Sequence, residues 1–248
     1  MAPPGGSVKT KLFFKGPLLT RSRFALRALR SRPDLFDIYI QPLQWGQTSW
    51  VSEDDEERRW IDNTIEKTLA FNHQQGSFDV SFQVTIPNEW ERLAPVNIGF
   101  TAGMETTKVA HQWLEKGNIM DRIVVVSNHS KNTYSNTSYL ATNKDTGEEI
   151  EIKLDTEIDV VNYPVKDFGI CPKLNLELDF DFNFLVMAQF GPRKNLPNTV
   201  KWFLEEFHNE EVGLVLKTNI TKNCTMDREK LFHDLKGFVS NFPNRRCK

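Results

Sequence analysis

The sequence predicts an α/β protein built from two Rossmann-like units, and three observations lead to this prediction. Strand and helix patterns alternate on both sides of an irregular stretch at residues 166–181. The aliphatic run Ile123–Val126 is typical of a central parallel strand that is buried on both faces. Further along, an apolar strand at Phe184–Ala188 leads through a Gly-Pro breaker into a helix expected to begin at Asn198.

Strands are expected where short apolar or alternating runs end at turn residues. The predicted strands are 11–14, 36–40, 78–84, 96–100, 123–126, 158–161, 184–188 and 212–217. The polar stretch 133–153 predicts a surface excursion or a small hairpin. We therefore expect an N-terminal unit over residues 8–165, a linker over 166–181 and a second unit over 182–248.

Helices are expected where apolar residues recur three or four positions apart. The predicted helices are 24–30, a helix after Ser52, 105–116, one from 128, one from 198 and 227–241. In the first helix we expect Phe24, Ala28 and Leu29 inward and Arg23, Arg27 and Arg30 in solvent. The acidic turn 53–57 is expected to need no partner, and Gly117-Asn118 to end its helix in a left-handed cap.

Composition excludes several classes of protein. The 248 residues carry a net charge of −2, which argues against a broad nucleic-acid-binding surface. We expect no membrane span, because no stretch approaches ~18 uninterrupted apolar residues. Residues 1–7 lack the apolar core of a signal peptide.

The cysteines favour a reducing compartment. Cys171, Cys224 and Cys247 show no CxxC spacing and no neighbouring histidine cluster, so neither a disulfide framework nor a metal site is expected. Four Asn-x-Ser/Thr sequons are interpreted as chance matches, and the predicted location is the cytoplasm.

Ligands of open parallel sheets bind beyond the carboxyl ends of the strands. Five segments are expected at such ends: Gly16, 87–89, 101–106, Ser127 and 191–194. In the last of these, Arg193 and Lys194 precede a helix N-terminus, a combination that favours an anion site. The alternative is an ordinary strand-to-helix turn with solvated charges.

Three segments resemble the N-terminal domain of retaining GT-B glycosyltransferases. They are Asn97–Thr106, Trp113-Leu114 and Asn118–Lys131, which follow the family run "E-T…W…N-x-M-D-x-I-x-V-x-S-x-x-x-K". Gly16-Pro17 resembles the first glycine loop of the family, and Ala188–Asn195 resembles the "G-R-x-x-x-x-K-N" run that opens its donor domain.

The resemblance implies a GT-B-like fold and a hexosyltransferase-like activity. Such enzymes transfer a sugar from a nucleotide-sugar donor to the hydroxyl of a glycan or other acceptor, with retention. The nucleotide-sugar is a co-substrate, and no metal or other cofactor is expected. Lys194 falls on the family lysine that contacts the donor diphosphate, Arg193 is a second candidate there, and Gly16 allows close approach to the first loop.

Two departures from the family pattern bear on activity. The arginine of "G-R" falls on Gln189, which cannot grip a phosphate in a bidentate manner. Nothing in the sequence resembles the late glycine-rich loop and the Glu-x7-Glu element of the donor domain. We therefore expect a donor domain that is incomplete in this sequence, with the missing half supplied by a further segment or a partner chain, or a protein without turnover.

The acceptor-side candidates are Glu105, Thr106, Glu89 and His129. Glu105 and Thr106 are expected either to meet acceptor hydroxyls or to cap the following helix. Glu89 is a possible base or an exposed turn carboxylate, and His129 is the only histidine expected near the cleft. Two alternatives remain besides the enzyme: an inactive GT-B-like nucleotide-binding or scaffold protein, and an unrelated flavodoxin-like pair of domains.

Overall fold

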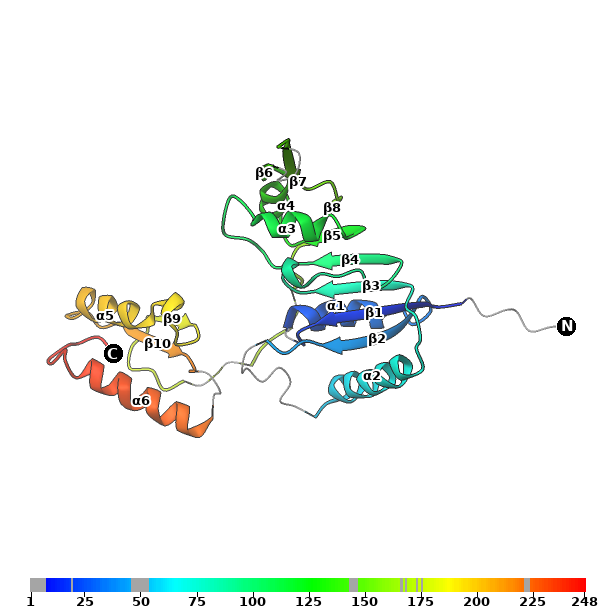
Figure 1. Cartoon of the computed structure of the whole chain (residues 1–248). Helices are drawn as coiled ribbons and strands as arrows, with labels where there is room; N and C mark the ends of the chain where they lie inside the picture. Colours follow the sequence, from blue (N-terminus) through cyan, green and yellow to red (C-terminus); the bar gives the residue numbers. More distant parts are fainter. Residues whose placement is uncertain are drawn as a thin grey trace. The chain divides into compact units, whose positions relative to one another are not determined.

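The computed structural model describes residues 8–18, 20–45, 54–142, 147–165, 167, 169–172, 174, 176–220 and 224–248. These residues form two compact units, the first up to residue 165 and the second from residue 167 (Figure 1). Each unit is described by itself.

The first unit is built on a six-stranded parallel sheet. Its strands lie in the order β2-β1-β3-β4-β5-β8. Their bounds are β1 Thr10–Gly16, β2 Phe36–Pro42, β3 Val80–Val84, β4 Val96–Phe100, β5 Arg122–Val125 and β8 Ile158–Val160. The order confirms an α/β fold of Rossmann-like kind, because it reverses between β1 and β3 as in doubly wound sheets.

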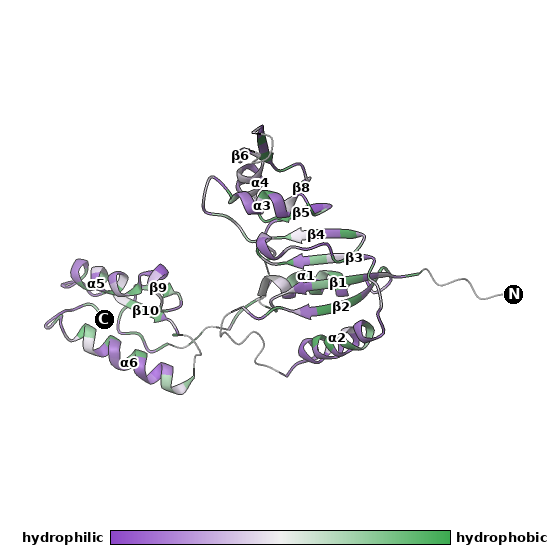
Figure 2. Ribbon diagram, viewed as in Figure 1, coloured by the Kyte–Doolittle hydropathy of each residue, from purple (hydrophilic) through white to green (hydrophobic). Residues whose placement is uncertain are grey.

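Helices connect these strands. They are α1 Thr20–Arg30, α2 Glu56–His73, the 3₁₀ turn η1 Pro87–Glu89, α3 His111–Gly117 and α4 Asn128–Ser135. The sheet core around Phe14, Val84 and Phe100 packs with α1 and α2. A second cluster, around Trp90 and Tyr134, packs with α3 and α4. Figure 2 shows how hydrophobic and hydrophilic residues alternate along α2.

The polar stretch at residues 133–153 contains the predicted hairpin. Strands β6 Ser138–Thr142 and β7 Glu149–Lys153 pair antiparallel. The α4 N-terminus is also as expected, since the Ser127 hydroxyl caps the helix by accepting from the Ser130 N–H.

Two expectations about the ends of the third helix are wrong. Helix α3 begins at His111, so the stretch 101–110 is not helical and Glu105 caps nothing. Gly117 lies within the helix, and its cap Asn118 has φ −71°, which is right-handed. A Cβ at Gly117 would lie 2.5 Å from the end of the Leu154 side chain, so Gly117 packs closely against that side chain.

The first helix also differs from its predicted faces. Leu29 packs against the core as expected and Phe24 is half-buried, but Leu26 is the fully buried apolar residue and Ala28 is exposed. The α1 arginines are not simply solvated, because Arg23 and Arg27 both pair with Glu57 of α2. The acidic start of α2 therefore has a partner, and its N-cap is Asp55; Ser52 and Glu53 lie outside the described residues.

The second unit contains a two-stranded parallel sheet. Its elements are β9 Asn183–Met187, η2 Pro192–Lys194, α5 Leu196–Glu206, β10 Gly213–Lys217 and α6 Thr225–Val239. Val200, Phe203 and Leu204 of α5 are buried as predicted, against Leu214 and Leu216 of β10. Among the helices of the described residues, none is long and apolar enough to cross a membrane.

Candidate functional site

The carboxyl edge of the large sheet collects the segments expected there. Because all strands of this sheet are parallel, Gly16, η1, residues 101–106 and Ser127 follow β1, β3, β4 and β5 at one edge. The strand order reverses between β1 and β3, and the loops at that switch point carry Gly16 and Glu89. Loops at a switch point diverge and leave a crevice, which is where such sheets bind ligands.

A buried lysine lies at this switch point. The Lys15 side chain is only 10% exposed, and its Nζ donates to Glu91 Oε2 at 2.7 Å and to the Glu89 carbonyl at 3.3 Å. The ammonium group lowers the pKa of the Glu91 carboxyl. The Glu89 carboxylate accepts a hydrogen bond from the Thr85 hydroxyl. Lys15, Thr85, Glu89 and Glu91 therefore form a polar cluster beside Gly16.

Gly16 is in close contact with the neighbouring strand. A Cβ at residue 16 would lie 2.7 Å from the Val84 carbonyl oxygen. The contact gives Gly16 a packing role within the described residues, in addition to the ligand approach expected from the sequence.

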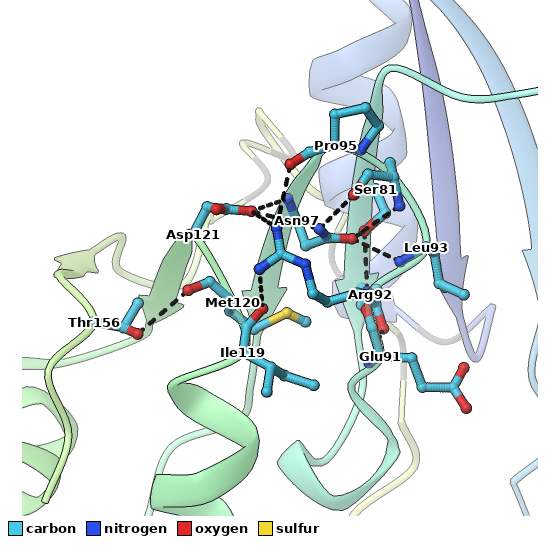
Figure 3. A network of polar contacts seen from close by, with 12 residues as sticks. Ser81, Glu91, Arg92, Leu93, Pro95, Asn97, Ile119, Met120, Asp121 and Thr156 are labelled. Atoms are coloured by element: carbon cyan, nitrogen blue, oxygen red, sulfur yellow. Dashed lines mark hydrogen bonds and ion pairs between the residues drawn. The ribbon is translucent and has the colours of Figure 1, made fainter.

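A buried amide network holds the segment that carries Glu89 and Glu91 (Figure 3). Asn97 Oδ1 accepts from the Ser81 hydroxyl and the Leu93 N–H, both at 2.8 Å. The Asn97 N–H donates to Asp121 at 2.7 Å. Gln83 adds a reciprocal pair with the Glu91 backbone, donating to its carbonyl and accepting from its N–H. These bonds fix residues 91–95 against β3 and β4.

A second polar group lies past the ends of β4 and β5. The exposed His129 ring makes a 3.1 Å hydrogen bond through Nε2 with the Thr106 carbonyl, which also accepts from the Thr133 hydroxyl. The Thr106 hydroxyl donates to the Lys108 carbonyl at 2.8 Å. Glu105 beside it is exposed. Thr106 and His129 are therefore brought together by α4 and the 101–110 stretch.

An apolar cavity of about 320 Å³ opens beside this edge. It lies between α1 and the sheet, and its walls include Phe24, Phe82, Phe100 and Val124. Val161, Asn162 and Pro164, which follow β8, also line it. The cavity is large enough for a small apolar group.

The second unit carries the predicted basic turn. Arg193 and Lys194 lie on η2, are exposed, and have no side-chain partner among the described residues. Asn195 follows with φ 51° as the N-cap of α5, and its side chain does not cap the helix. Helix α5 begins at Leu196, two residues before the predicted start, and Pro197 removes one N–H donor from its first turn.

Gln189 has a structural contact at the position where the glycosyltransferase pattern has arginine. Its side-chain amide donates to the Ile220 carbonyl at 2.9 Å and so ties the end of β9 to the loop after β10. The sequence did not predict this contact between Gln189 and Ile220.

No family model matches the sequence, and no curated protein is significantly similar to it.

Sequence reasoning missed the lysine at the centre of the switch-point cluster. One signal was present: Lys15 is a charged residue that directly follows the apolar run Leu12–Phe14 and precedes Gly16. A charge buried beside such a run must be paired, because burying it alone is costly. Its partner Glu91 lies 76 positions away and is not identifiable from spacing.

Proposed function

We propose that this chain is a glycosyltransferase of the retaining GT-B kind. The first unit binds the acceptor, and the second begins the domain that binds the nucleotide-sugar donor. The sugar is transferred from the donor to an acceptor hydroxyl with retention.

The position of the matched segments carries the proposal. Gly16, Thr106, Ser127 and the segment ending at Glu89 all come from one carboxyl edge of a parallel sheet. The sheet reverses its order between the strands that lead to Gly16 and Glu89, which is where doubly wound sheets hold ligands. Of the segments that resemble the glycosyltransferase pattern in this unit, Gly16, residues 101–106 and Ser127 therefore share this edge, whereas Trp113-Leu114 lies on α3 and residues 118–121 precede β5.

The chemistry of donor cleavage needs fixed positive charge. As the bond from sugar to diphosphate breaks, negative charge grows on the departing phosphate oxygens. A cation already in place stabilises that charge more in the transition state than in the ground state. Arg193 and Lys194 supply two cations that no side chain of the described residues neutralises. Lys194 is assigned to the diphosphate, with Arg193 beside it.

The acceptor hydroxyl needs hydrogen-bonding groups that are held in place. Glu89 is half-buried and is oriented by Thr85, so its carboxylate is suited to accept a bond from a hydroxyl. Thr106 and His129 are linked to each other and supply a second polar surface at the same edge. Glu105 is exposed beside them and is the least constrained candidate.

Binding of a nucleoside diphosphate tests the donor assignment. Lys194→Ala should weaken binding about tenfold to a hundredfold, since a hydrogen bond to a charged group contributes roughly 1.5–3 kcal/mol. The matched control is Lys236→Ala, which removes an exposed cation from α6. Isothermal titration calorimetry on the 248-residue chain measures both. Equal affinity of Lys194→Ala and the parent would remove Lys194 from the site.

A second candidate function is nucleotide binding without turnover. Gln189 favours it, because the residue is neutral where the family pattern has an arginine and its amide is already engaged with Ile220. A panel of nucleotide-sugars, first screened by thermal shift and then assayed for release of the diphosphate, distinguishes the two. Binding with release supports the enzyme, and binding without release supports the second candidate.

A further inference from the structure

The outer edge of β9 is an unpaired strand edge. In the parallel pair of β9 and β10, the Phe182 carbonyl accepts from the Gly213 N–H and the Ala188 N–H donates to the Lys217 carbonyl. Backbone groups alternate in direction along a strand, so the even-numbered residues of β9 face β10. The N–H and C=O groups of Asn183, Leu185 and Met187 point the other way. Within the described residues, no hydrogen bond reaches them.

The same edge carries apolar side chains that are open to solvent. Leu185 is 67% exposed and Met187 is 68% exposed, on the face of β9 opposite to α5. The five residues of β9 include no charge and no proline. Natural edge strands are normally protected from pairing by lysine, proline, a bulge or a cover. None of these protects β9 in the described part of the second unit.

The outer edge of β10, on the other side of this small sheet, is partly covered by hydrogen bonds. On β10, the Leu214 N–H donates to the Lys248 carbonyl at 2.6 Å, and the Lys248 N–H donates to the Val212 carbonyl at 3.1 Å. The residues near Lys248 thus cover the start of the β10 edge. Among the described residues, backbone hydrogen bonds therefore cover the start of the outer edge of β10 and leave the outer edge of β9 unpaired.

Charge along the chain selects the direction in which a second strand can pair. Acidic residues precede β9 at Glu177 and Asp181, and basic residues follow it at Arg193 and Lys194. A second copy of the chain in antiparallel alignment brings the acidic flank of one copy to the basic flank of the other. A parallel alignment brings like charges together.

We infer that two copies of this chain associate through β9, pairing antiparallel about a twofold axis at Leu185. Each of Asn183, Leu185 and Met187 exchanges its outward backbone hydrogen bonds with the partner copy, and the two Leu185 side chains pack together. The result is a continuous sheet of four strands with β9 and its symmetry mate at the centre. This interface is independent of the proposed glycosyltransferase activity.

Sedimentation of the full chain tests the interface. We expect a monomer–dimer equilibrium between about 1 and about 100 µM, as suits a small interface. Leu185→Lys places two like charges opposite each other on the axis and should raise the dissociation constant at least about tenfold. The matched control is Phe232→Lys, which makes the same charge change at an exposed apolar residue of α6 and should leave the equilibrium unchanged.

Three results would overturn the inference. The chain could remain monomeric at every concentration, the dimer could survive Leu185→Lys, or the chain could form open-ended assemblies, which a closed twofold pair does not allow.

Cross-linking tests the register without relying on affinity. In a background with Cys171→Ser and Cys224→Ser, Leu185→Cys brings two sulfurs together at the axis, where paired Cα atoms lie about 5.5 Å apart. Met187→Cys is the control, because in this register residue 187 lies opposite residue 183 of the partner copy. Faster disulfide-linked dimer formation by Leu185→Cys supports the axis, and equal or slower formation refutes it.

Discussion

Replacing Gly16 with alanine separates two roles that the same residue could have. Gly16 ends β1 at the switch point, where the proposed function uses its lack of a side chain for ligand approach. The structure gives a second reason for glycine. An added Cβ would lie 2.7 Å from the Val84 carbonyl oxygen and 3.1 Å from Val84 Cβ. The first neighbour is backbone of a buried strand, so it cannot move aside cheaply.

The magnitude follows from this contact. Forcing an extra methyl into a packed core costs about 1–3 kcal/mol. The same change gains about 0.4–1 kcal/mol through the unfolded chain, which loses freedom when glycine is replaced. Gly16→Ala should therefore destabilise the first unit by about 1 kcal/mol, within a range of roughly 0–2.6 kcal/mol. The matched control is Gly191→Ala, because Gly191 has φ −151° and a Cβ there meets nothing within 4 Å.

Hydrogen exchange in urea measures the effect on the first unit by itself. Exchange followed on peptides of β1 and β3 reports unfolding of the large sheet, whereas a whole-chain signal would mix the two units. Gly16→Ala should lower the free energy of unfolding of these strands, and Gly191→Ala should leave it unchanged. If Gly16→Ala were as stable as the parent chain, the close packing against Val84 would not constrain this position, and ligand approach would be the remaining reason for glycine.

Two further predictions concern the contacts that hold the first unit together. The pKa of Glu57 is lowered by its bonds to Arg27 and Arg23, so its contribution to stability is present above the ordinary carboxyl pKa and is lost as pH falls through the lowered value. The stability difference between the parent and Glu57→Gln, measured by urea titrations, should thus be largest near neutral pH and shrink in acid. A difference that does not change with pH would refute this role of the ion pairs. Asn97→Ala should cost about 3 kcal/mol, because it removes the acceptor of the buried Ser81 hydroxyl and of the half-buried Leu93 N–H. The exposed Asn63→Ala should stay within about 0.5 kcal/mol, and similar losses for the two would refute the role of the amide network.

The sequence predicted the strands of both units well, because their signal is local. Alternation or a short aliphatic run closed by turn residues is enough to mark β4, β5 and β10, and the observed bounds differ from the predicted ones by one residue or less. The inward face of α5 was predicted correctly for the same reason. Its apolar residues repeat at three and four positions, and the helix packs that stripe against β10.

Helix starts and charge partners were less predictable. The 101–110 stretch contains residues with adequate helix propensity, yet its backbone is committed to contacts with α4, including the Met104 N–H to the Ser130 hydroxyl at 3.3 Å. Such contacts depend on the tertiary fold and override local propensity. The pairing of Arg23 with Glu57 is of the same kind, since the two residues lie 34 positions apart on different helices.

The position of Lys15 is the strongest internal argument that the switch point has a function. A buried ammonium group loses much of its hydration, and here it is compensated by the carboxylate of Glu91, whose side chain is 56% exposed, and by one backbone carbonyl. Such a pair adds little net stability compared with an apolar residue of similar size. What the ammonium does achieve is to bind the Glu89 carbonyl and so fix the backbone of the loop that presents the Glu89 carboxylate. Lys15 follows the apolar run of its strand, adds little stability and orients a carboxylate at the carboxyl edge, and this combination supports the ligand binding proposed for the switch point.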